Sequence, residues 1–170
     1  MVRAFATGLL SSFGHNPTIA IPDFQGEVQF ASPALDEASA RLVIQAASLT
    51  VTDDISAKDR EEIERRMHDE VLETDGFEEI IYECDKVSPI QKISEGQYTV
   101  TLNGELSLHG VTQVQPVSAR VTVKGDTLRA VGDFSIRQSD YDIRPVSAAG
   151  GTVKLKDELK LSFDITARKS

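Results

Sequence analysis

A segment of alternating apolar and polar residues, from Glu95 to Asp142, constrains the fold of this chain more than any other feature. It reads EGQYTVTLNGELSLHGVTQVQPVSARVTVKGDTLRAVGDFSIRQSDYD, and almost every second residue in it is apolar. Successive side chains of a β-strand point to opposite faces of the sheet, so this alternation is typical of long antiparallel strands with one dry and one solvated face. The segment therefore predicts a sheet that encloses an apolar interior.

Two dipeptides in this segment resemble hairpin turns, and the pattern of apolar residues shows which of them is expected to form one. A two-residue turn at Asn103-Gly104 would mix apolar and polar residues on one face, so we expect a continuous strand with a bend or bulge at Gly104. A turn at Gly125-Asp126 instead pairs Val121 with Ala130. The other pairs on the same face of the sheet are also apolar, which predicts a hairpin.

The stretch 109–112 is expected to form a four-residue turn that places Val100 beside Val121. Three long strands then follow at about 97–108, 113–124 and 127–142. The remaining apolar runs predict strands near 3–11, 17–21, 24–30, 39–52, 79–87 and 158–167.

A different period marks one helix. Ile63, Met67 and Val71 recur every four residues among charged ones, and Ser56 provides an N-cap, which predicts an amphipathic helix at about 57–73. One helix and roughly eight strands in sequential order predict a mainly β fold, an eight-stranded antiparallel up-and-down barrel with this helix inserted. The length of 170 residues favours a single domain that spans 1–170.

The charge of the chain is concentrated in one place. Twelve acidic and four basic residues lie between 53 and 79, a local balance of −8 within a total of −9. Without a basic stripe the chain is not expected to bind nucleic acid or an anionic membrane surface. No apolar run approaches the ~20 residues of a membrane span, so it is not expected to be an integral membrane protein. The start lacks the pattern of a signal peptide, so we expect a cytoplasmic chain, or a periplasmic or secreted one if it is a processed form.

Small residues on the proposed inner face leave room for a lumen of ligand size, unless large residues from the opposite wall fill it. These small residues are Ala46, Gly104, Ala119, Ala130 and Gly132.

Two strings within the alternating segment resemble those of the YceI family, the polyisoprenoid-binding, lipocalin-like barrels. They are GELSLHGVT at 104–112 and FSIRQSDY at 134–141, with Gln138 where the family often has Arg. The stretches 13–15, 26–28 and 67–87 resemble further parts of the family pattern in the same order. The resemblance implies an apolar lumen that takes a long-tailed amphiphile, and it allows a homodimer. His15 follows Gly14 in an expected loop, where it could donate to a head group, and it is the candidate head-group contact; the alternative is that it has no ligand role. The expected tail contacts are Leu42, Ile44, Ala46, Ile80, Tyr82, Val100, Leu102, Leu106, Val121, Phe134 and Phe163.

Catalytic and metal motifs are not evident. The three histidines lack metal-ligand spacing, and neither a Gly-x-Ser-x-Gly elbow nor a P-loop occurs, so we expect no catalytic residues, no metal and no cofactor. His109 is expected to brace its turn through a hydrogen bond, and Cys84 to be a buried apolar side chain.

The leading hypothesis is therefore a non-enzymatic carrier that binds an isoprenoid-like or fatty amphiphile. Two alternatives remain open: an interaction module that uses the acidic helix 57–73, and a hydrolase or isomerase that uses His15.

Overall fold

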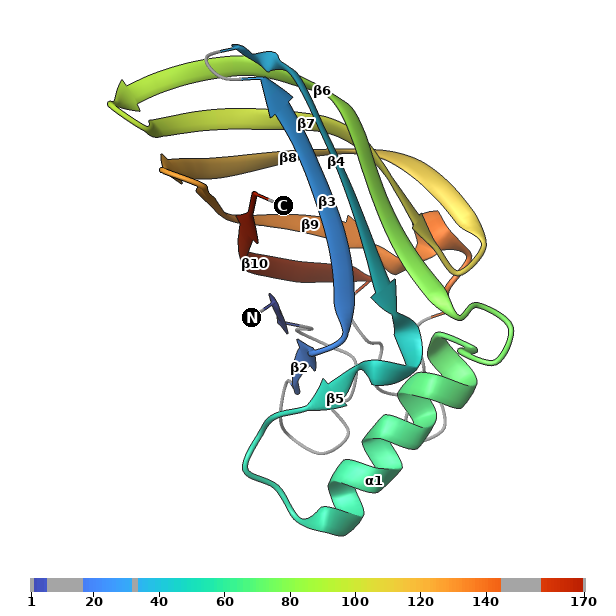
Figure 1. Ribbon diagram of the computed structural model, residues 1–170. Coiled ribbons are helices and arrows are strands. Elements are labelled where there is room, and N and C mark those ends of the chain that lie inside the picture. Colours follow the sequence, from blue (N-terminus) through green and yellow to red (C-terminus); the bar gives the residue numbers. More distant parts are fainter. Residues whose placement is uncertain (1, 6–16, 32–33, 145–156, 170) are drawn as a thin grey trace.

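The computed structural model describes residues 2–5, 17–31, 34–144 and 157–169, which form one ten-stranded antiparallel sheet. The sheet curls into a half-barrel, and the helix lies across its lower end (Figure 1). The strands are β1 (Val2–Phe5), β2 (Thr18–Ile21), β3 (Phe24–Ala31), β4 (Ala34–Gln45), β5 (Thr50–Val51), β6 (Glu79–Ser94), β7 (Gln97–Leu108), β8 (Val111–Lys124), β9 (Thr127–Arg137) and β10 (Glu158–Arg168). The predicted mainly β fold with one inserted helix is confirmed.

The strand order follows the chain over most of the sheet. From β6 to β10 each strand pairs with the next, as an up-and-down fold requires. The order departs at the N-terminus, where β1 pairs with both β10 and β2, and β2 pairs with β5. Consequently β3 and β5 form the two ends of the sheet.

The strand count and several strand limits differ from the prediction. The sequence predicts eight strands, whereas the described residues contain ten. The run predicted as one strand at 39–52 breaks after Gln45, because a 3-10 turn, η2 (Ala46–Ser48), turns the chain away and β5 then pairs with β2. The amide of Ala46 donates to the carbonyl of Glu78 at 2.8 Å, which anchors this break beside β6. Residues 6–11 of the strand predicted at 3–11 lie outside the described residues.

The helical segment agrees closely with its prediction. The hydroxyl of Ser56 accepts a hydrogen bond from the Asp59 amide at 3.1 Å and caps α1 (Ala57–Arg66). One π-helical turn, η3 (Met67–Val71), continues α1. The apolar stripe of Ile63, Met67 and Val71 is buried, so the helix covers one end of the half-barrel with this stripe.

Two of the three turn predictions are confirmed. Residues 97–108 form one continuous strand through Asn103-Gly104, and the irregular pairing lies opposite, in β6 between Cys84 and Val87. The hairpin at Gly125-Asp126 has the predicted register, with Val121 opposite Ala130.

The turn between β7 and β8 is shorter than predicted. His109 and Gly110 both have positive φ, at 52° and 75°, and form a two-residue turn that pairs Leu108 with Val111. The register therefore moves by two residues, so Val100 lies opposite Ala119 and not beside Val121.

Candidate functional site

An apolar cavity of about 360 Å³ lies inside the half-barrel, between the sheet and the helical segment. Strands β2–β4, β6–β10 and the turn η3 all contribute to its wall. Ligand pockets in proteins commonly enclose roughly 300–1,000 Å³ and have mostly apolar walls, so this cavity has the size of a small-ligand site.

Most of the residues predicted to face the lumen lie on the cavity wall. They are Leu42, Ile44, Ile80, Tyr82, Leu102, Leu106, Phe134 and Phe163. The other three do not line it: Ala46 is fully buried in η2, while Val100 and Val121 pack in a second, smaller core with Val87 and Leu128. His15 lies outside the described residues, so its predicted head-group contact is not located.

Several wall residues were not among the predicted contacts. Met67 and Val71 from η3, together with Leu72, close the lower end of the cavity. The four-residue period of the helix signalled this apolar face, but the sequence alone does not place it inside the barrel. Further wall residues come from β2 and β10: Ile19, Ile21, Leu159, Leu161 and Ile165.

The small inner residues do not create the lumen in the way predicted. A β-carbon at Gly104 would lie 2.5 Å from the Tyr82 hydroxyl oxygen, and one at Gly132 would lie 2.7 Å from the ring of Phe163. Each glycine therefore accommodates an aromatic ring from the neighbouring strand. Of the five small residues, Ala130 lines the cavity.

Two polar residues lie beside this apolar interior, of which Tyr82 is partly buried and Gln138 is fully buried. The Tyr82 hydroxyl lies 3.1 Å from the carbonyl oxygen of Gln115 and 3.3 Å from that of Leu102, and burial raises the pKa of Tyr82 well above its usual range. Gln138, at the position where the family often has Arg, is buried on the cavity wall next to the helical end. Tyr82 and Gln138 are therefore polar residues within a mostly apolar wall.

Cys84 is buried, as predicted, and burial raises the pKa of its thiol. A buried thiol with a raised pKa is a poor nucleophile, since the thiolate is the reactive form.

The ring of His109 braces the β7–β8 turn. Its Nε2 lies 2.7 Å from a carboxylate oxygen of Glu73, and its Nδ1 lies 3.2 Å from the carbonyl oxygen of Tyr141. The ring also packs against Phe77, with the centroids 4.3 Å apart. These contacts join the end of the helical segment, the turn and η4 (Gln138–Tyr141), as the turn-bracing prediction requires.

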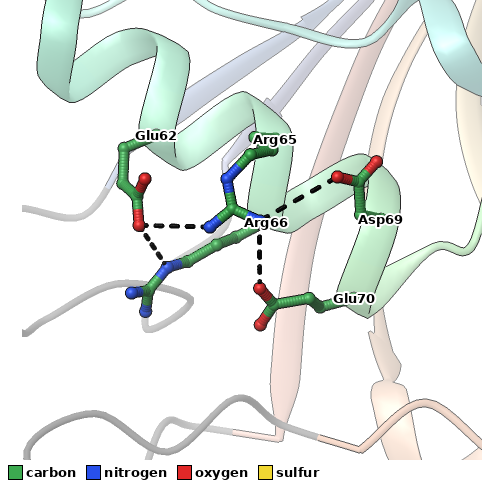
Figure 2. A network of polar contacts seen from close by, with 5 residues as sticks. All are labelled: Glu62, Arg65, Arg66, Asp69 and Glu70. Carbon is green, nitrogen blue, oxygen red and sulfur yellow. Dashed lines mark hydrogen bonds and ion pairs between the residues drawn. The ribbon is translucent and has the colours of Figure 1, made fainter.

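The acidic helix carries its own network of ion pairs (Figure 2). One carboxylate oxygen of Glu62 accepts from Arg66 at 2.8 Å and from Arg65 at 3.3 Å. These bonds, first that from Arg66, hold the pKa of Glu62 below its usual range. Arg65 also approaches Asp69 and Glu70, so part of the acidic surface is neutralised within the helix.

Within the described ranges, no group of three or more His, Cys, Asp or Glu side chains is arranged to hold a metal ion. In the same part of the chain, no helix combines the length and apolarity that crossing a membrane requires.

Comparisons with known proteins agree with this architecture. A model of the YceI-like domain matches residues 6–167. No curated protein matches the sequence.

Similar solved structures share the fold at low sequence identity. Burkholderia cenocepacia BcnA is 19% identical with a TM-score of 0.72, and the match covers 98% of this chain and 94% of BcnA. A polyisoprenoid binding domain from Saccharophagus degradans, implicated in plant cell wall breakdown, is 14% identical with a TM-score of 0.71, covering 99% and 93% of the two chains. The Campylobacter jejuni YCEI protein is 14% identical with a TM-score of 0.65, covering 89% and 84%.

Proposed function

Because this chain belongs to the YceI family, we propose that it binds the tail of an isoprenoid-like or fatty amphiphile in its cavity and does not transform it chemically. The observation that carries the proposal is the apolar cavity of about 360 Å³ inside the half-barrel. The polyisoprenoid binding domain from Saccharophagus degradans, which shares the fold, supports a ligand of this class.

The energetics of such a wall favour an alkyl or prenyl tail. Each methylene group transferred from water to an apolar site contributes ~0.8 kcal/mol, so ten of them supply about 8 kcal/mol before the costs of association. A charged contact is therefore not needed for useful affinity. The proposed tail contacts are the predicted residues that line the wall, among them Leu42, Leu106, Phe134 and Phe163.

Native mass spectrometry of the gently purified protein, together with uptake of an added fatty alcohol, tests the proposal. We expect a bound amphiphile that is lost on denaturation. A wild-type protein that neither retains nor takes up any fatty or prenyl compound would contradict the proposal.

A pair of adjacent substitutions locates the binding in the cavity. Ala130 lines the cavity, whereas the next residue, Val131, is exposed on the other face of β9. Ala130→Phe adds a benzene ring, which by itself fills a cavity of roughly 150 Å³, and should abolish or greatly weaken uptake. Val131→Phe adds the same ring outside and should leave uptake unchanged. Equal uptake by both variants would place the ligand elsewhere.

A further inference from the structure

The cavity has an open end and a closed end. Near β3 and β10 its lining includes the exposed residues Glu27, Lys160 and Thr166, and Val28 on β3 is 36% exposed. At the helical end, the lining residues Met67 and Val71 are 2% and 4% exposed. A tail that enters between β3 and β10 therefore meets a floor formed by η3.

We infer that this floor sets the length of the tail, with about 14 carbon atoms enclosed and Val71 as the stopping residue. This inference rests on the proposed binding function and adds the size class of the ligand. A dry cavity of roughly 150 Å³ accommodates benzene, which corresponds to roughly 25 Å³ per carbon atom. At that value, the volume of about 360 Å³ holds about 14 carbons. The fitting class is a single straight tail of that length or a chain of three isoprene units.

A longer polyisoprenoid would leave part of its chain outside the cavity. Carbons beyond the enclosed length stay in contact with water, so they gain little of the transfer free energy that drives binding. Affinity should then rise with chain length up to the enclosed length and level off beyond it.

Val71 is better suited than Met67 to act as a stop. Its β-branched side chain is restricted to few rotamers, while the unbranched Met67 can change shape around a ligand. The position of Val71 is also restricted by its near neighbour in the chain, Glu73. A carboxylate oxygen of Glu73 lies 2.7 Å from Nε2 of His109 in the β7–β8 turn. The floor is therefore held against the sheet independently of any ligand.

Displacement of anilinonaphthalene sulfonate by straight-chain alcohols of about 8 to 20 carbons tests the length limit. In the wild-type protein, affinity should rise about fourfold per methylene and become level near 14 carbons. Val71→Ala removes two methyl groups and should move the plateau about two carbons longer. Ile63→Ala is the matched control, since Ile63 is buried on the same helical stripe but does not line the cavity.

The outcomes separate the two proposals. Absence of displacement by every alcohol contradicts the binding function itself. Binding that strengthens steadily through 20 carbons leaves the binding function in place and overturns the length limit. A plateau near 14 carbons that Val71→Ala and Ile63→Ala shift equally, or not at all, overturns the assignment of Val71 as the stop.

Discussion

The phenol ring of Tyr82 lies directly over Gly104, so close that a β-carbon at Gly104 would come within 2.5 Å of the Tyr82 hydroxyl oxygen. The same β-carbon would lie 2.5 Å from the carbonyl oxygen of Glu83, which belongs to the rigid backbone of β6. Glycine is therefore required here for close approach and not for an unusual φ.

We predict that Gly104→Ala lowers the free energy of unfolding by at least ~2 kcal/mol, because neither the backbone of β6 nor the packed ring can move aside without cost. Urea denaturation measures the change. Gly76→Ala serves as the control, since its β-carbon would lie 3.6 Å from the nearest atom, and it should change stability by less than ~0.5 kcal/mol. A Gly104→Ala protein as stable as the wild type would show that neither the Tyr82 ring nor the Glu83 carbonyl approaches Gly104 this closely.

The alternation of residues determined much of the fold. The requirement that apolar side chains share one face accounts for three features of β7, β8 and β9. They are the apolar face itself, the continuous strand through Asn103-Gly104 and the hairpin at Gly125-Asp126. The register of β7 with β8 does not follow, because it depends on His109 adopting a positive φ that residues other than glycine adopt only in a few per cent of cases. The pairing of β1 with β10 joins opposite ends of the chain, which no local pattern encodes.

The candidate site was predictable in part. Alternation correctly placed residues such as Leu106 and Phe134 on the inner face, where they line the cavity. The prediction that small residues open the lumen was wrong at two positions. The rings of Tyr82 and Phe163 occupy the space beside Gly104 and Gly132. Which ring fills which space depends on contacts between strands, and a single sequence does not record them.

His109 combines a positive φ with close polar contacts from both ring nitrogens, to the Glu73 carboxylate and the Tyr141 carbonyl, so its replacement has two separable effects. His109→Ala should lower the free energy of unfolding by about 1–3 kcal/mol, because the ring contacts with Glu73, the Tyr141 carbonyl and Phe77 are lost. His109→Asn keeps a residue that tolerates positive φ but cannot reproduce the ring contacts, so it should recover only part of the loss. Thermal or urea unfolding of both variants measures this. Equal stability of all three proteins would contradict a bracing role.

Asp157 and Asp164 are both acidic groups with lowered pKa values, but for different physical reasons. The Asp157 carboxylate accepts the Ser139 hydroxyl at 2.5 Å and the Ser139 amide at 2.8 Å, and these bonds hold its pKa below the usual range. The pKa of Asp164 is lowered first by its hydrogen bond from Arg129, within an exposed ion pair.

Both groups should stabilise the protein above their unfolded pKa of ~4, and this contribution should be lost as the pH falls through the lower, folded values. The pKa values of the two carboxyl groups should respond differently to added salt. About 1 M NaCl should raise the pKa of Asp164 toward its ordinary value, since exposed ion pairs are screened, and change that of Asp157 much less. Carboxyl NMR titration at low and high salt measures both. The same salt response for both groups would contradict the distinction.

The helix is attached to β5 through one residue, Val51, whose backbone amide and carbonyl are both bound by helix side chains. Glu64 accepts from the Val51 amide at 2.8 Å, and Arg60, one turn earlier, donates to the Val51 carbonyl. This attachment holds the helix, with Met67 and Val71, against the closed end of the cavity. Glu64 therefore has a structural role, and its replacement would confound any test of the acidic helix as a docking surface.

We predict that Glu64→Ala speeds hydrogen exchange at the Val51 amide by about tenfold or more, since losing a hydrogen bond to a charged group costs ~1.5–3 kcal/mol. Glu64→Gln keeps an oxygen acceptor and should lie between Ala and the wild type. Glu61→Ala, on the exposed side of the same helix, is the matched control and should leave this amide unchanged. Hydrogen exchange followed by NMR, with all four proteins compared at one pH, measures the effect. Unchanged protection in Glu64→Ala would mean that the Glu64 carboxylate does not hold the Val51 amide.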